Sequence, residues 1–162
     1  GLGGERIGEF YSRLKRFSYH RPYPTTLIVH VGTNNIFACK THETRRQAEL
    51  TLSDIRNLLP CTRIIWSLIL PRRYFDKEQG AGAGANCLRN VNKHVIRVAR
   101  KTGVRVIHHT QMFPLRSCEL FARDGLHLSD QGLVVFRKHL QDALIYFNGN
   151  PSELEYPPRV KV

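Results

Sequence analysis

The sequence predicts an α/β domain of three layers, in which helices cover both faces of a parallel β-sheet. Three observations lead to this prediction. Short apolar runs without polar alternation are typical of strands buried on both faces. Longer stretches between them carry apolar residues at every third or fourth position, as amphipathic helices do. The two kinds of stretch alternate along the chain, and such alternation is typical of parallel strands joined by helical crossovers.

In the first part of the chain, a helix is predicted over residues 5–17, whose apolar residues share one face. The next element is a strand over residues 25–32, TTLIVHVG, which ends at a glycine. A second helix is predicted over residues 44–59, where Thr44 and Gln47 have the spacing of a capping box.

In the second part of the chain, the run RIIWSLIL predicts a strand over residues 63–70, and a proline follows it. The helix predicted over residues 86–102 is followed by a glycine, the residue that most often ends helices. A strand over residues 104–109 and a last helix over residues 130–147 complete the order. Ser129 is placed to cap that last helix.

The length of 162 residues and the hydrophobic content of 41% suit one globular domain. We expect this domain to occupy residues 1–147. Residues 148–162 contain three prolines and no period, which predicts an extended or disordered tail. The glycines of residues 71–85 could cradle a phosphate, but the GK[ST] continuation of a P-loop is absent, which favours a flexible surface loop.

The chain is strongly basic, with 25 Lys and Arg against 13 Asp and Glu and a formal net charge of +12. This charge favours polyanionic partners such as nucleic acid or an anionic membrane surface. No apolar run approaches the roughly 20 residues that span a bilayer, and no signal-peptide pattern opens the chain. We therefore expect no transmembrane segment and an intracellular location, cytoplasmic or nuclear.

The cysteines and histidines do not predict a metal site. The four cysteines lie far apart without a CxxC pair, and His108 and His109 have no partner at metal-ligand spacing. We expect reduced thiols, no bound metal and no organic cofactor.

Two polar stretches follow predicted strands, and ligands of open parallel sheets collect at the carboxyl ends of strands. In DGLHLSDQG, residues 124–132, Asp124 can hold one imidazole nitrogen of His127 while the other faces a cleft, as a general base requires. In GTNN, residues 32–35, Asn34 can direct its side-chain amide at a developing oxyanion. The structural alternatives are a capped Asp-Gly turn in the first stretch and a strand-ending turn in the second. Together, the two stretches suit acyl transfer.

With the glycine cluster GLGG near the start, these stretches resemble three of the four sequence blocks of the SGNH (GDSL) hydrolases. This superfamily of esterases and lipases has a flavodoxin-like α/β/α fold. The resemblance covers residues 1–147 and is closest to the hydrolase domains that retroelements encode. It implies that His127 is the general base and that the Asp124 carboxylate orients it. It also implies that the Asn34 amide and the backbone of Gly4 (or Gly3) donate to the oxyanion.

The resemblance leaves the nucleophile unassigned. In the superfamily a serine lies in a GDS block at the end of the first strand, upstream of the glycine block, whereas Ser12 and Ser18 fall within or just after a helix pattern. Asn35 also replaces the aspartate that is usual in the family. Because the family fold has two strands before the glycine block, we expect an incomplete amino-terminal part and an unpaired apolar edge on the strand of residues 25–32. An upstream segment or another chain would cover that edge, or copies of the chain would associate through it.

Two functions remain open at this point. The first is an ester hydrolase that acts on small acyl esters and has little or no activity in this chain for lack of the serine. The second is a catalytically inactive basic scaffold that binds nucleic acid without sequence preference, or an acidic partner. Its candidate surface is a stripe of cations at helical spacing, although amphipathic helices commonly have a charged outer face: Arg89, Lys93, Arg97 and Arg100. A second basic cluster lies near the start of the chain: Arg6, Arg13, Lys15, Arg16 and Arg21.

Overall fold

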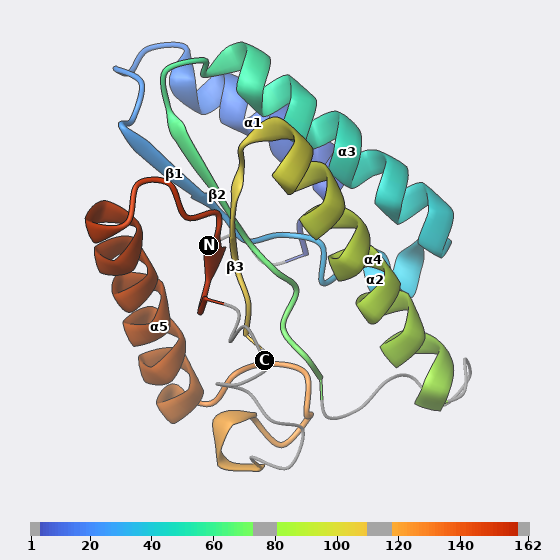
Figure 1. Cartoon of the computed structure of the whole chain (residues 1–162). Coiled ribbons are helices and arrows are strands. Elements are labelled where there is room, and N and C mark those ends of the chain that lie inside the picture. The colour runs from blue at the N-terminus through green and yellow to red at the C-terminus, as the bar shows by residue number, and fades with distance from the viewer. Residues whose placement is uncertain (1–3, 73–80, 110–117, 159–162) are drawn as a thin grey trace.

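The computed structural model describes residues 4–72, 81–109 and 118–158 (Figure 1). Its centre is a parallel sheet of four strands in the order β1-β2-β3-β4. The strands are β1 (Thr26–Val29), β2 (Arg63–Ser67), β3 (Arg105–Ile107) and β4 (Glu155–Tyr156). The predicted α/β class with a parallel sheet is confirmed.

Helices cover both faces of the sheet (Figure 1). On one face lie α1 (Ile7–Ser18), α3 (Thr41–Leu58) and α4 (Ala81–Thr102), which pack side by side, and on the other lies α5 (Asp130–Gly149). Two short elements, the helix α2 (Asn35–Ala38) and the 3-10 turn η2 (Cys118–Leu120), follow strand ends and have no counterpart in the sequence prediction. None of the described helices combines the length and the hydrophobicity that crossing a membrane requires.

The strands are apolar on both sides because each side faces a helical layer. On β2, Ile64 and Trp66 belong to the cluster beneath α1, α3 and α4, whereas Ile65 belongs to the cluster beneath α5, with Ala143 and Phe147. Trp66 is buried in the core. This double burial explains why the strand residues form continuous apolar runs in the sequence.

Several predicted boundaries shift in the structure. Helix α3 begins at Thr41, so Thr44 and Gln47 do not form a capping box, and the Thr44 hydroxyl instead donates to the Lys40 carbonyl at 3.2 Å. Helix α4 begins at Ala81 and takes up the end of the stretch predicted as a flexible loop over residues 71–85, of which residues 73–80 lie outside the described part. Gly103 ends α4 with a positive φ of 67°, as its position predicts.

The described part of the tail is held against the sheet. After α5 ends at Gly149, the chain returns to form β4, which places Glu155 opposite Val106 and Tyr156 opposite Ile107 in β3. This strand adds to the three that the sequence predicts. Residues 159–162 of the tail lie outside the described part.

Strand β1 forms one edge of the sheet. The Thr25 carbonyl accepts a hydrogen bond from Arg63 N at 2.9 Å, and backbone direction alternates along a strand, so the N–H and C=O groups of Thr26 and Ile28 point away from β2. No described strand pairs with this outer side of β1. The apolar, unpaired edge expected on residues 25–32 is therefore present in the described structure.

Candidate functional site

The Asp124 carboxylate holds His127 in one orientation. Asp124 Oδ2 lies 2.7 Å from His127 Nδ1, and Asp124 Oδ1 accepts from the backbone N–H groups of Leu126 at 2.8 Å and His127 at 3.0 Å. These hydrogen bonds, first that from the His127 ring and then those from the two backbone groups, lower the pKa of Asp124 to about 2. Nδ1 is thereby engaged by the carboxylate, and the His127 side chain is 76% exposed.

The local fold of this turn depends on residues with distinct roles. Gly125 has a φ of 64°, which a glycine adopts without strain. Ala122 N donates to the His127 carbonyl at 2.9 Å, and an isolated bridge between Phe121 and Leu128 closes the loop. The Ser129 hydroxyl accepts from Gly132 N at 3.1 Å, which confirms the predicted cap of α5.

Asn34 joins the GTNN stretch to the glycine block. Its Nδ2 donates to the Glu5 carbonyl at 3.1 Å, immediately after Gly4, which has a φ of 83°. An amide nitrogen carries two hydrogens, so this bond leaves one for another acceptor. The two groups that the family resemblance assigns to an oxyanion hole, the Asn34 amide and the backbone of Gly4, thus lie close together in the structure.

Asn35 is fully buried and ties α1 to α3. Its Oδ1 accepts from Ile7 N at 2.9 Å, and its Nδ2 donates to Gln47 Oε1 at 2.8 Å. Gln47 in turn donates to Glu43 at 3.0 Å. The oxygen and the nitrogen of the Asn35 amide, which replaces the family's aspartate, are therefore both hydrogen-bonded, the nitrogen to the amide oxygen of Gln47.

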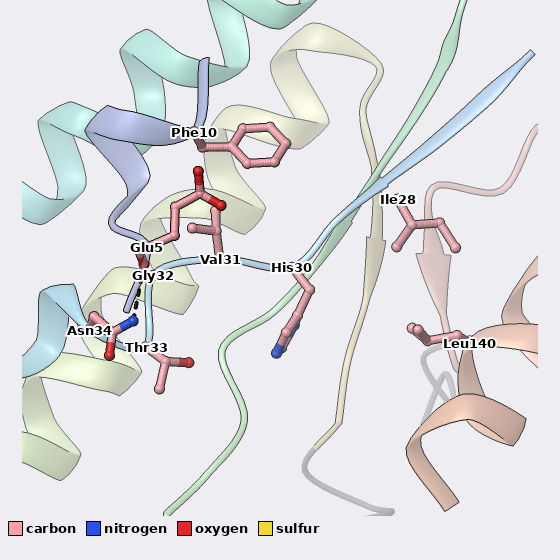
Figure 2. A pocket seen from close by; sticks show the side chains of 9 residues that line it. All are labelled: Glu5, Phe10, Ile28, His30, Val31, Gly32, Thr33, Asn34 and Leu140. Atoms are coloured by element: carbon pink, nitrogen blue, oxygen red, sulfur yellow. Dashed lines mark hydrogen bonds between the residues drawn. The ribbon is translucent and has the colours of Figure 1, made fainter. Parts of the chain in front are cut away.

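A pocket of about 540 Å³ runs along the free edge of β1 (Figure 2). Phe10 of α1 lines it on one side of the sheet and Leu140 of α5 on the other, with Asn34 at one end and Ile28 further along β1. The remaining lining residues follow the glycine block or the end of β1 in the chain: Glu5, His30, Val31, Gly32 and Thr33. The pocket thus joins the sheet edge to the candidate oxyanion groups.

A network that the sequence analysis missed joins the carboxyl ends of three strands through two buried residues, Ser67 and His109, and through His30 beside the pocket. The Ser67 hydroxyl lies 2.9 Å from His30 Nδ1 and 2.8 Å from His109 Nε2. Burial, and then the neighbouring histidines, lower the pKa of His109 to about 2, so this ring is a very weak base at neutral pH. Ser67 is completely buried. The network resembles a catalytic serine–histidine pair, but its burial suits a structural role. The one signal of it in the sequence is a polar residue at or just after the end of each of the three strands.

Phe136 of α5 connects the pocket with the Asp124–His127 turn. Its ring lies 4.9 Å from that of His30, which lines the pocket, and it packs against the small cluster of Leu120 and Phe121 below the turn. Burial lowers the pKa of Arg72 to about 10, and the negative charge of Asp124 opposes that shift. Buried Arg72 is therefore close enough to this turn to interact with the Asp124 carboxylate. Both candidate stretches therefore lie at the carboxyl ends of the strands.

The serines considered in the sequence analysis lie on another element than the Asp124–His127 turn. Ser12 and Ser18 lie on α1, and the Ser18 hydroxyl donates to the Leu14 carbonyl at 2.9 Å. In the part of the chain that the structure describes, no serine hydroxyl is hydrogen-bonded to His127, and no group of three His, Cys, Asp or Glu side chains could hold a metal ion.

The cations of the α4 stripe differ in their surroundings. Arg89, Lys93 and Arg97 are exposed, whereas Arg100 makes an ion pair with Glu155 at 2.5 Å. Nearby, burial and then the charge of Arg45 and, more weakly, that of Arg97 lower the pKa of His94, even though Glu49 is bonded to it. Arg100 is therefore paired with an acid of β4, whereas the other three cations of the stripe face solvent.

Comparison with known proteins gives one family. The model of the GDSL-like Lipase/Acylhydrolase family matches residues 1–133. No curated protein matches the sequence at a significant level.

Solved structures of similar fold include three at low sequence identity. A GDSL-like lipase from Bacteroides thetaiotaomicron superposes with a TM-score of 0.72 at 14% identity, over 90% of this chain and 74% of that one. A psychrotrophic esterase from Pseudoalteromonas gives 0.67 at 15% identity, over 91% and 75%. The esterase domain of the ORF1 protein of the zebrafish ZfL2-1 retrotransposon gives 0.56 at 21% identity, over 89% and 85%. At these identities, the likeness shows the fold.

Proposed function

The chain belongs to the GDSL-like lipase/acylhydrolase family, and from that membership we propose that it supplies the base and the oxyanion-binding groups of a retroelement-type hydrolase of small acyl esters. The observation that carries this proposal is the Asp124–His127 pair, with Nδ1 held at 2.7 Å and Nε2 left for a substrate. The retroelement type rests on the fold shared with the esterase domain of the zebrafish retrotransposon.

His127 would act as the general base. It would take the proton of a serine hydroxyl as that oxygen attacks the ester carbonyl, and then return the proton to the leaving alcohol. Asp124 would stabilise the imidazolium that forms in between. The carboxylate needs no rearrangement for this role, because three hydrogen bonds already fix it.

Asn34 and the backbone at Gly4 would stabilise the negative oxygen of the tetrahedral intermediate. The bond from Asn34 to Glu5 supports this role, because it fixes the amide plane and keeps one N–H for the oxyanion. Asn35 and Gln47 support it indirectly by holding Ile7, and with it the start of α1, in place.

The serine would come from a segment outside residues 1–162. The free edge of β1 favours a strand that pairs beside it in parallel and ends near Asn34. Ser67 does not suit the role, because it is completely buried and, of its two histidine partners, His109 is a weak base.

Turnover of a short-chain chromogenic acetate ester and labelling by a serine-directed fluorophosphonate test this proposal. We expect neither from residues 1–162, and both from a version that includes any coding sequence preceding Gly1. In that version, His127→Ala should lower kcat/KM about 10³-fold or more, and circular dichroism should show an intact fold because the side chain is exposed. An extended version that is labelled but keeps its turnover without His127 would refute the assignment of the base.

A second candidate function is polyanion binding. The observation that favours it is α4, whose residues Ala81–Thr102 include five Lys and Arg and no acid. Affinity for a random DNA or RNA should then fall steeply as salt rises, since phosphate contacts release counterions. Lys93→Ala/Arg97→Ala should flatten that slope, whereas an affinity that does not depend on salt would exclude this function.

A further inference from the structure

Every exposed Phe or Tyr side chain that the structure describes lies in one short segment. Phe17, Tyr19 and Tyr23 are 61%, 79% and 58% exposed, and the other strongly exposed large apolar residues are all aliphatic. An exposed ring keeps apolar surface in water, so three of them within seven residues favour a surface made for contact. This segment, which we call the aromatic segment, spans residues 17–23, from the last turn of α1 towards β1.

Cations accompany these rings. The sequence contains no Asp or Glu from residue 10 to residue 42. Lys15, Arg16 and Arg21 are exposed there. The Arg21 guanidinium lies 3.8 Å from the centre of the Phe17 ring, and the rings of Tyr19 and His20 meet edge to face at 4.6 Å. The aromatic segment therefore combines flat rings with charges that no acid of that stretch neutralises.

The segment lies at the amino ends of the strands, the opposite end of the sheet from the Asp124–His127 turn (Figure 1). The Thr62 hydroxyl donates to the Pro24 carbonyl at 2.7 Å, and Arg56 donates to the Thr62 carbonyl at 3.1 Å. Arg63 starts β2 beside Thr25. The pKa of Arg105, which starts β3, is lowered by burial and then by the charge of Arg63. Positive charge thus continues along this end of the sheet.

We propose that the aromatic segment binds single-stranded nucleic acid, with bases stacked on Phe17, Tyr19 and Tyr23 and phosphates bound by Lys15, Arg16 and Arg21. Unpaired bases offer flat faces that stack on aromatic rings and on guanidinium planes, and the adjoining cations follow the backbone. Base pairs in a duplex hide those faces, so single strands are preferred. The proposal rests on the polyanion-binding candidate function and assigns to it a site distinct from the stripe on α4.

The composition of the surface favours nucleic acid over a lipid bilayer. The exposed aliphatic residues that could enter a hydrocarbon layer, such as Val134 and Ile145, lie on α5 and outside the segment. The apolar face of α1 is also occupied, because Ile7 and Leu14 are buried against the core. Binding to an anionic membrane is the competing outcome that the test includes.

The test measures fluorescence anisotropy of labelled oligothymidylate and of a DNA duplex of the same length, with the whole chain and four variants. Tyr19→Ala/Tyr23→Ala should lower the affinity for the single strand by tenfold or more and change duplex affinity little, since stacking is lost and the charges remain. Tyr19→Phe/Tyr23→Phe should keep the affinity, because the ring faces are retained. Val134→Ala/Ile145→Ala removes exposed apolar groups elsewhere and should have no effect.

The fourth variant, Lys93→Ala/Arg97→Ala on α4, separates this inference from the function on which it rests. If only this variant weakens binding, polyanion binding stands and the aromatic segment is not its site. Unchanged single-strand affinity in Tyr19→Ala/Tyr23→Ala overturns the proposal, as does an equal loss for duplex and single strand. So does loss of binding to phosphatidylserine vesicles without loss of oligothymidylate binding, which would assign the segment to a membrane surface. Circular dichroism of each variant confirms that the fold is intact.

Discussion

At the scale of single residues, Asp124 and His127 show what close spacing can predict. Both partners lie within one turn, so the sequence alone brings the carboxylate within reach of the ring, and the structure has the two at 2.7 Å. Ser67 shows the opposite case. Its partners, His30 and His109, come from other segments of the chain, and only the parallel sheet places them beside it. A contact between distant segments has no local pattern in the sequence.

The pKa of Asp124 can be tested directly. It should lie near 2, below the 3.8 of an unperturbed side chain, because the His127 ring and two backbone groups donate to the carboxylate. With the folded pKa lowered, the contribution of these bonds to stability is present above pH 4 and is lost as the pH falls from about 4 to about 2. A carboxyl-detected NMR titration measures the pKa, and His127→Ala should raise it. An unchanged value in that variant would mean that the ring is not the main donor.

At the scale of the elements, glycine and amide residues fix how neighbouring segments meet. Gly132 allows the first turn of α5 to lie against η2, and Asn35 fastens the start of α1 to α3. The sequence predicts the capped start of α5 because Ser129 is a local signal. It mispredicts the start of α3, because the helix begins three residues before Thr44, and the Gln47 side chain bonds Asn35 and Glu43.

Gly132→Ala should destabilise the protein. A Cβ at this position would lie 2.0 Å from the Leu120 carbonyl oxygen, which is backbone and cannot turn away, so α5 or η2 would have to shift. Forcing extra volume into a packed site costs about 1–3 kcal/mol. Urea denaturation measures the loss.

Gly149→Ala is the matched control on the same helix. A Cβ there meets nothing within 4 Å, so this change should be neutral or slightly stabilising. Equal changes in the free energy of unfolding for Gly132→Ala and Gly149→Ala would show that helix propensity, and not the contact between Gly132 and the Leu120 carbonyl, determines stability at these positions.

Asn35→Ala should lower the free energy of unfolding by about 1–3 kcal/mol, because it leaves the buried Ile7 N–H and the Gln47 amide without their partner. Asn35→Asp should cost less, since its carboxylate still accepts from Ile7, even if Gln47 turns its amide to donate and gives up its bond to Glu43. Chemical denaturation of both variants compares them. A larger loss for Asp than for Ala would mean that Gln47 is not free to turn.

At the scale of the whole molecule, the two edges of the sheet differ. The chain itself covers the β3 edge, because the segment after α5 returns as β4. The sequence does not predict this strand, because two residues are too few to show a hydrophobic period. The β1 edge was expected from the resemblance to a fold with additional strands, and the described structure leaves it unpaired.

We predict that copies of residues 1–162 associate through β1 at high concentration. Thr26→Pro should reduce this association, because it removes an N–H that points away from β2 and leaves the β1–β2 hydrogen bonds in place. Sedimentation velocity over a range of concentrations measures the effect. Leu27→Pro, whose N–H faces β2, should instead lower stability. Association that persists unchanged in Thr26→Pro would place the contact elsewhere.

The parallel direction of β4 also determines at which end of the sheet the described part of the chain ends. Because β4 runs with the other strands, the last described residues emerge at the same end of the sheet as Gly4, which lies beside Asn34 (Figure 1). An affinity tag or a reporter fused at either terminus would therefore crowd the candidate catalytic end. A circular permutant, joined across that end and opened between α3 and β2, would move both new termini to the far side and leave His127 unobstructed.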